Sequence, residues 1–252
     1  MYMKNKMKSV FQSLMRFTLF SVLFSVLLVV VLKWIPIAWT PLMFFREMGD
    51  DIPEKTPIRH TWVDANSIPT SMELAVVCTE DQRFLNHHGF DFEQIKAAME
   101  DSEEGGRSRG ASTISQQTAK NVFLWPTSSW IRKGFEVWFT VLIEGIWGKD
   151  RIIEVYLNSI EFGPGVYGVE AASHFFFKKP AISMSHAECA RLAVVLPNPL
   201  KYDAGKPGKY VNRRQNWALQ QMQNYGYDID LTRTSTDEPA ENSKEKPKKK
   251  SK

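Results

Sequence analysis

The segment "EDQRFLNHHGFDF", from Glu80 to Phe92, holds the first residues that could do chemistry. Glu80 and Asp81 follow an apolar stretch, and a carboxylate beside an apolar wall gains the raised pKa that a general base needs. His87 and His88 are adjacent, so on a helix they would point in different directions and would not share a metal ion. On this segment alone, a solvated acidic pair at a helix end is the favoured interpretation.

A second segment, "RGASTISQQTAKN" from Arg109 to Asn121, is dense in hydrogen-bonding side chains. Its Ser/Thr start predicts a capped helix, whose N-terminus would suit an anion. Thr113, Gln117 and Lys120 follow the spacing i, i+4, i+7 and would share one helix face. An ordinary capped helix with a polar side is the alternative. The glycine-rich residues 105–110 before it predict a mobile loop.

A third segment, "RKGFE", places Arg132 and Glu136 four residues apart, with Lys133 beside them. A surface ion pair on a helix, worth about 0.3–0.5 kcal/mol, is one interpretation. The surrounding residues are rich in Trp and Phe, however, and charges on an apolar helix indicate the wall of a cleft.

Together these segments combine two candidate carboxylates with three or four cations. Chemistry at the anomeric carbon of a sugar commonly uses two carboxylates. A plain hydrolase has no need of clustered Lys and Arg, whereas a departing diphosphate does, because cations stabilise the charge that develops on it. The combination predicts a glycosyl donor with a diphosphate leaving group, and a membrane anchor would make that donor lipid-linked.

Composition excludes some classes of protein. The chain has 252 residues and a formal net charge of +4, but its basic residues gather at both ends. The middle is therefore mildly acidic, which argues against a nucleic-acid surface and suits a membrane neighbour at the ends. Cys78 and Cys189 lie in apolar stretches, so two buried thiols are favoured over a disulfide. No metal-binding spacing surrounds either cysteine.

The apolar stretch near the N-terminus predicts a membrane anchor. It has no charge from Phe17 to Leu32, and it continues to Trp39 with only Lys33 interrupting it. About 20 residues cross a bilayer as a helix, Lys33 can reach the headgroups, and Trp suits the interface. A cleaved signal peptide would be shorter and end at small residues. The preceding basic residues predict a cytoplasmic N-terminus and a catalytic domain outside the inner membrane.

The rest of the chain divides by composition. We predict a basic N-terminus (1–16), an anchor (17–39), a proline-rich connector (40–71), a globular domain (72–230) and a disordered polar tail (231–252). Within the domain the hydrophobic periodicity is mostly helical, so the fold class is mainly α. Helices are expected in the following stretches: 72–84, 112–124, 130–147, 149–160 and 185–197, the last with a capping box at Ser185 and Glu188.

Four motifs in this order resemble those of the peptidoglycan glycosyltransferases, the bacterial polymerases of lipid II. They are "EDQRFLNHHGFD", "GASTISQQTAKN", "RKGFEVW" and "RIIEVYLNSIEFGPGVYGVEAAS", within residues 70–200. The short chain resembles monofunctional members rather than bifunctional penicillin-binding proteins. The resemblance implies a mainly helical, lysozyme-like domain with a smaller membrane-proximal lobe, preceded by one transmembrane helix.

The resemblance also implies a role for each site residue. Glu80 would be the general base that deprotonates the 4-hydroxyl of the acceptor sugar, which attacks C1 of the growing chain with inversion and releases undecaprenyl diphosphate. Glu136 would be the second essential glutamate, at the donor side. The remaining positions would shape the site or face the diphosphate: Asp81, Phe84, His87, Thr113, Gln117, Lys120, Arg132 and Lys133. No dedicated cofactor is implied; a divalent cation, Mg²⁺ or Mn²⁺, would come with the substrate.

Some residues depart from the pattern or lie outside it. Ser115 stands where threonine is common and Ala111 where glycine is common, and both keep the chemistry. Tyr156 and Asn158, in the fourth motif, are interpreted as structural. The serine–x–x–lysine pattern at residues 243–246 lies in the predicted tail and is attributed to chance, so no β-lactam binding is expected.

Two other functions remain open at this stage. A membrane-anchored lytic glycosidase would use the two carboxylates but would leave the cations without a role. A non-catalytic scaffold for other cell-wall synthesis proteins would not need the full set of polar site residues.

Overall fold

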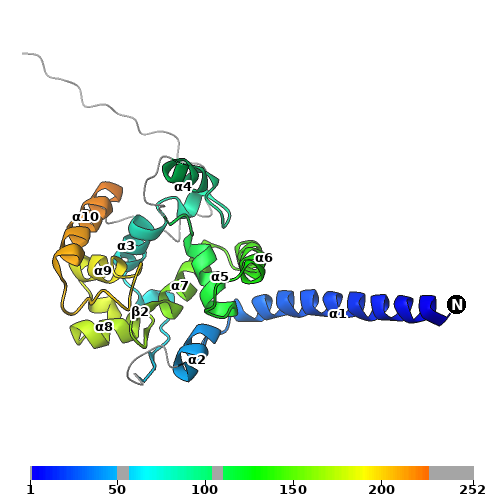
Figure 1. The fold of residues 1–252 in the computed structure, drawn as a ribbon. Coiled ribbons are helices and arrows are strands. Elements are labelled where there is room, and N and C mark those ends of the chain that lie inside the picture. Colours follow the sequence, from blue (N-terminus) through cyan, green and yellow to red (C-terminus); the bar gives the residue numbers. More distant parts are fainter. Residues whose placement is uncertain (1, 50–56, 104–109, 227–252) are drawn as a thin grey trace, which may run out of the picture.

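The structure, a computed structural model, describes residues 2–49, 57–103 and 110–226. The fold is mainly helical, as the sequence predicted, and the long helix α1 (Tyr2–Leu32) projects from a globular body (Figure 1). Most of the predicted loop at 105–110, the tail at 231–252 and the serine–x–x–lysine pattern lie outside the described residues.

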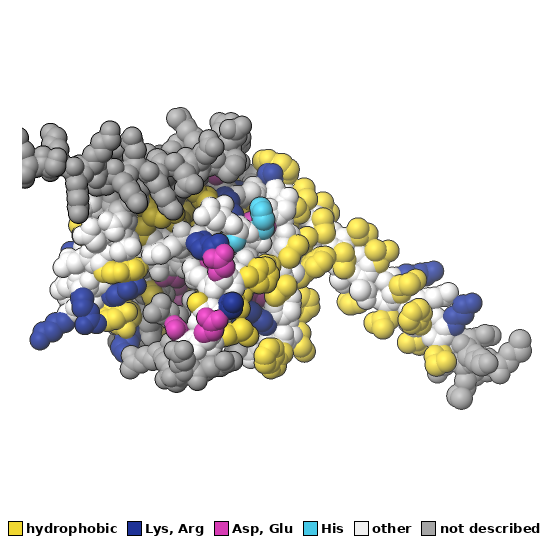
Figure 2. All heavy atoms as spheres, turned by 90° about the horizontal axis from the view of Figure 1, so that it is seen from above, with side chains coloured by type: hydrophobic (Ala, Val, Ile, Leu, Met, Phe, Trp, Pro, Cys, Tyr) yellow, Lys and Arg dark blue, Asp and Glu magenta, His cyan; other side chains and the backbone are white. Residues whose placement is uncertain are grey.

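Helix α1 is long and apolar enough to cross a membrane, over Met7–Leu32. Hydrophobic side chains cover its exposed surface, with Lys and Arg towards its free end (Figure 2). The helix begins earlier than the anchor predicted at 17–39, because residues 2–16 contain no Pro or Gly. It ends at Leu32 rather than near Trp39, because Pro36 lacks an N–H donor and disfavours helical geometry in the residue before it.

Helix α1 is joined to the body by hydrogen bonds at its C-terminal end. Lys33 Nζ donates to the carbonyl of Ile146 (2.6 Å), the last residue of helix α6 (Trp130–Ile146). In return, Arg151 Nη2 donates to the carbonyl of Leu32 (3.0 Å), the last residue of α1. Each cation thus satisfies a carbonyl at the C-terminal end of a helix, where no backbone partner exists: Lys33 that of α6, and Arg151, on α7 (Lys149–Ser159), that of α1. Lys33 is used in this junction, and its expected position near the lipid headgroups stays a prediction.

The body consists mainly of helices, with one small sheet (Figure 1). Its other helices are α2 (Pro41–Met48), α3 (Thr70–Glu80), α4 (Phe92–Glu103), α5 (Ile114–Phe123), α7 (Lys149–Ser159), α8 (Val169–Phe177), α9 (His186–Ala193) and α10 (Lys209–Tyr225), with 3-10 turns at Ala65–Ser67, Phe84–Asn86 and Ala181–Ser183. Strands β1 (Arg59–His60), β3 (Val166–Tyr167) and β2 (Glu161–Gly163) lie in that order, with β1 parallel and β2 antiparallel to β3.

The core forms where these helices pack on one another. α3 packs against α9 and α10, and α5 packs against α6 and α7. α3 buries every residue from Ser71 to Cys78, and this accounts for its largely apolar sequence. Cys78 and Cys189 are free thiols buried in this core, as predicted. Ser185 and Glu188 form the predicted capping box of α9.

The segment predicted as a connector is packed against the body over much of its described length. α2 lies against α5, and β1 pairs with β3. Asn158, fully buried on α7, donates from Nδ2 to the carbonyl of Val63 (2.9 Å) and accepts from its N–H (2.9 Å). His60 Nε2 lies 2.9 Å from the Asn158 carbonyl. The interpretation of Asn158 as structural agrees with these contacts.

We expect Asn158→Ala to destabilise the protein by about 2–3 kcal/mol, because it leaves the N–H and carbonyl of Val63 without partners. Asn212→Ala, at an exposed amide on α10, is the matched control and should change stability by less than about 0.5 kcal/mol. Urea unfolding of both purified variants in the same detergent measures the difference. Equal midpoints for the two variants would contradict the anchoring role of Asn158.

Candidate active site

Glu80 is the last residue of α3 and is half-buried. Gln117 Nε2, on α5, donates a hydrogen bond to Glu80 Oε2 (2.9 Å). Burial raises the pKa of the Glu80 carboxyl, while the Gln117 hydrogen bond and the charges of Arg214 and Lys120 act in the opposite direction. A carboxylate with a raised pKa and one aligned donor has the properties of a general base.

Gln117 is itself oriented by a buried tyrosine. The Tyr156 hydroxyl donates to Gln117 Oε1 (3.3 Å), so the amide oxygen faces Tyr156 and its NH₂ group faces Glu80. Tyr156 is fully buried on α7. The sequence interpretation of Tyr156 as structural missed this link to the candidate base, because spacing alone does not show which side chains of α7 reach α5.

Asp81 and His87 form a buried pair next to Glu80. His87 Nε2 lies 2.9 and 3.1 Å from the two carboxylate oxygens of Asp81, and both residues are buried. Asp81 Oδ2 also accepts from the backbone N–H of Ile114 (3.0 Å), the first residue of α5. The Asp81 carboxylate therefore fixes the start of α5 against the end of α3. Since the Asp81 carboxylate is satisfied by protein groups, the geometry favours a supporting role for Asp81 over substrate contact, whereas His87 Nδ1 is buried without a hydrogen-bond partner.

Phe84 and Thr113 are buried as well. The Phe84 ring lies under the Lys149 ammonium group, 4.4 Å from the ring centroid. The Thr113 hydroxyl caps α5 by accepting from the Gln116 N–H (3.2 Å), and it donates to the carbonyl of Gly89 (2.7 Å). Gly89 has a φ of +88°, and a Cβ there would lie 2.7 Å from a methyl group of α6. The Thr113 hydroxyl is thus occupied, although Thr113 was predicted to face the diphosphate.

The predicted cations gather around a second buried carboxylate. Arg132 Nη1 donates to Glu136 Oε2 (3.0 Å), and Lys133 Nζ contacts Glu136 Oε1. Glu136 is only 3% exposed, so it is held in place by the two cations. Lys120, on α5, is exposed as a residue, but desolvation of its ammonium group lowers the pKa of that group. The charge of Glu136 opposes this change, and the charges of Arg132 and Lys133 reinforce it.

These groups line three separate hollows. Glu80 borders one of about 330 Å³, together with α4. Gln117 and Lys120 border a second of about 280 Å³, and Arg132 and Lys133 border a third of about 410 Å³. The hydrogen bond from Gln117 to Glu80 links the first hollow to the second. Lys120, in the second hollow, interacts electrostatically with Glu80 in the first and with Arg132 and Lys133 in the third. The structure therefore brings the predicted base and the predicted cations into one electrostatically connected region.

Two further residues at Glu80 lie outside the stretch that carried the sequence resemblance. Arg214, on α10, stacks on Trp217 with 3.9 Å between its guanidinium carbon and the ring centroid, and its charge lowers the pKa of Glu80. Trp217 lines the same hollow as Glu80. The sequence of α10 shows only a polar amphipathic helix, so it contained no signal that these side chains reach the site.

Comparison with known proteins adds to this geometry. The transglycosylase family model matches residues 49–223, which include all four motifs. The chain belongs to the transglycosylase family. It is similar to the biosynthetic peptidoglycan transglycosylase of Pseudomonas aeruginosa, with 46% identity over 90% of this chain and 98% of that protein. Proteins of the same description match from Bacteroides thetaiotaomicron (49% identity, 78% and 79% covered) and Caulobacter vibrioides (50%, 74% and 79%). The resemblance to this family is thus confirmed.

The raised pKa of Glu80 leads to a prediction that does not depend on turnover. Gln117→Leu removes a hydrogen bond that favours the ionised carboxylate, so the pKa of Glu80 should rise further. Carbon-13 NMR titration of labelled glutamate, assigned with Glu80→Gln, measures it. Gln220→Leu, at an exposed position of α10, is the control and should leave this pKa unchanged. An unchanged or lower pKa in Gln117→Leu would exclude the proposed orientation of the amide.

Proposed function

We propose that this chain polymerises lipid II into glycan strands, inverting the configuration at C1 of the growing chain and releasing undecaprenyl diphosphate. The observation that carries the proposal is that Glu80, a carboxylate with a raised pKa, lies next to a cluster of three cations, Lys120, Arg132 and Lys133. Gln117 donates a hydrogen bond to Glu80, and Lys120 interacts electrostatically with Glu80 and with the other two cations. Membership of the transglycosylase family and the similarity to biosynthetic peptidoglycan transglycosylases support it.

Glu80 acts as the general base in this scheme. Its carboxylate takes the proton of the acceptor 4-hydroxyl while that oxygen attacks C1 of the donor. Burial makes the carboxylate more basic, and the hydrogen bond from Gln117 leaves its other oxygen, Oε1, for the substrate. The charge of Arg214 opposes this rise in the pKa of Glu80.

The cations act on the leaving group. As the bond from C1 to the diphosphate oxygen breaks, negative charge develops on that oxygen, and Lys120, Arg132 and Lys133 stabilise it. Glu136 binds Arg132 and Lys133 from the buried side, so it positions these two cations. This gives the second glutamate a donor-side role without direct attack on the sugar.

A lytic glycosidase acting on finished peptidoglycan is the weaker candidate. It needs an acid and a base carboxylate beside the scissile bond. Here the second carboxylate, Glu136, is buried and already bound by two cations. Cleavage of a neutral glycan would leave those cations without a function.

We place the catalytic body at the outer face of the cytoplasmic membrane, anchored by α1. The basic residues at the start of the chain favour a cytoplasmic N-terminus, and the apolar helix that follows is long enough to span the bilayer once. The acceptor and donor then reach the site from the membrane in which both are anchored. Contacts with other cell-wall synthesis proteins stay a prediction.

Glu80→Gln should lower the rate of glycan polymerisation by about 10³-fold, because an amide cannot accept the proton. The amide is nearly isosteric, so the unfolding midpoint should stay close to that of the unchanged protein. Glu100→Gln, at an exposed glutamate on α4, is the matched control and should keep the full rate. The assay follows labelled lipid II into polymer on gels.

Three outcomes would count against the proposal. Near-native polymerisation by Glu80→Gln would remove Glu80 from the role of base. Failure of the unchanged protein to form any polymer across detergents and divalent metals would exclude the transferase function. Release of soluble fragments from purified sacculi would instead support the lytic alternative.

Metal removal separates a substrate-borne cation from a protein-bound one. Among residues 2–49, 57–103 and 110–226, no group of three or more His, Cys, Asp or Glu is arranged to hold a metal ion. A Mg²⁺ or Mn²⁺ ion would therefore be bound through the substrate diphosphate. We expect EDTA to slow polymerisation while the unfolding temperature of the substrate-free protein stays unchanged. A lower unfolding temperature in EDTA would point to a metal site in the protein.

A further inference from the structure

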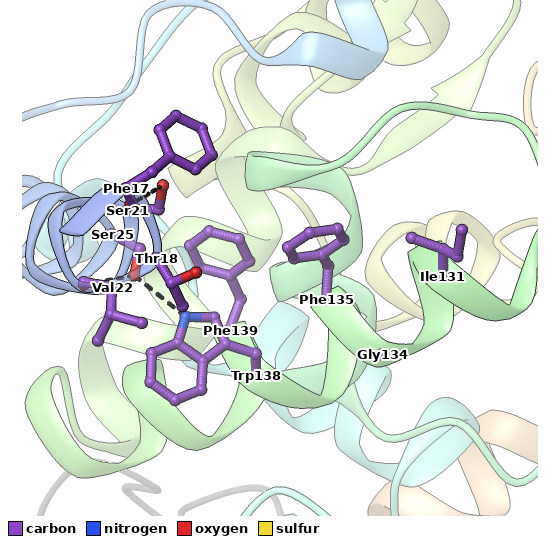
Figure 3. Close-up of a pocket in the computed structure, with 10 residues that line it drawn as sticks. All are labelled: Phe17, Thr18, Ser21, Val22, Ser25, Ile131, Gly134, Phe135, Trp138 and Phe139. Atoms are coloured by element: carbon purple, nitrogen blue, oxygen red, sulfur yellow. Dashed lines mark hydrogen bonds between the residues drawn. The ribbon is translucent and has the colours of Figure 1, made fainter. Parts of the chain in front are cut away.

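An apolar groove of about 650 Å³ lies between the membrane helix α1 and helix α6 (Figure 3). One wall consists of α1 residues and the other of α6 residues: Phe17, Thr18, Ser21, Val22 and Ser25 on α1, and Ile131, Gly134, Phe135, Trp138 and Phe139 on α6. Phe135, Trp138 and Phe139 project from α6 towards α1 in this view (Figure 3). The groove is distinct from the three hollows of the candidate active site.

Hydrogen bonds hold the two walls of the groove together. Trp138 Nε1 donates to Ser25 Oγ (3.1 Å), across the base of the groove. Further along, Trp147 Nε1 donates to the carbonyl of Val29 (2.7 Å). Because these bonds join α1 directly to α6 and its C-cap, the groove is a built feature of the fold and not a chance gap beside a loose tether.

Helix α6 connects this groove to the cation cluster. Ile131, Phe135 and Trp138 follow the spacing i, i+4, i+7 and share the face towards α1. Arg132 and Glu136 lie one residue further along, about 100° round the helix, on the charged face. A ligand whose diphosphate binds Arg132 and Lys133 therefore has the mouth of an apolar groove beside it on the same helix.

We propose that this groove binds the first part of the polyprenyl chain of the lipid-linked donor, and holds the same chain after undecaprenyl diphosphate is released. The inference rests on the proposed function for the identity of the lipid. An isoprenoid chain is apolar, so its transfer into a groove lined by Phe and Trp is favourable. Its attachment to a diphosphate, bound next to the groove, distinguishes it from the acyl chains of bulk phospholipid.

Gly134 offers a sharp test of the groove. A Cβ at Gly134 would meet no atom within 4 Å, so a larger side chain there would fill the groove without displacing the backbone. Gly145 is also exposed on α6 and also has free space at its Cβ, but it does not line the groove. Gly134→Leu and Gly145→Leu therefore make the same chemical change, with the same gain in helix propensity, inside and outside the groove.

The first measurement is steady-state polymerisation by the full chain in detergent, with lipid II carrying either a full-length or a severely shortened prenyl chain. For the full-length donor, Gly134→Leu should raise KM about tenfold, because part of the chain loses its apolar contacts. For the shortened donor KM should not change, and Gly145→Leu should match the unchanged protein with both. Equal effects of Gly134→Leu on both donors, or no effect on either, would overturn the proposal.

The second measurement does not require turnover. A polyprenyl diphosphate with a diazirine in its chain should label peptides of α1 and α6 in the unchanged protein, and label them less in Gly134→Leu. A phospholipid carrying the same diazirine should label them weakly. Equal labelling by both lipids, or no labelling by the diphosphate, would overturn the proposal and favour bulk lipid or another membrane helix in the groove. If labelling succeeds but no polymer forms, the proposed function fails while the lipid-binding groove stands.

Discussion

The buried carboxylate of Asp81 is the constraint on which the site depends. It accepts from the first N–H of α5 and pairs with His87, so the end of α3 and the start of α5 have one fixed relation. Gln117 lies one turn into α5, and only in this relation does its amide reach Glu80. The first and second sequence motifs are therefore adjacent because one acid side chain ties together two helix ends that the chain separates by 33 residues.

Two opposing electrostatic environments meet across α5. At Glu80, burial raises the pKa of the carboxyl. At Lys120, burial and the charges of Arg132 and Lys133 lower the pKa of the ammonium group. Both shifts move these groups towards neutrality, and each is moderated by the charge of the other. A basic carboxylate next to a cluster of cations suits a transfer reaction that takes up a proton at one point and leaves negative charge at another.

Much of this arrangement could be predicted from the sequence, but not all of it. The helices were predictable from periodicity, and the capping box of α9 from Ser185 and Glu188, because such signals are local. The division between exposed and buried polar residues was not: Thr113 shares a spacing with Lys120, yet its hydroxyl is used as a cap. Tyr156 and Arg214 reach the site only through packing of α7 and α10, and a linear motif does not contain that information.

The reciprocal contacts at the foot of α1 have a mechanical consequence. Since Lys33 closes the end of α6 and Arg151 closes the end of α1, the stem and the body move as one piece. If α1 anchors the chain in the membrane, as proposed, this junction holds the body at a fixed height above the bilayer, which a flexible linker would not do. Each lipid-linked sugar that diffuses within the bilayer would then meet the active site at the same height, whatever the length of the glycan strand already formed.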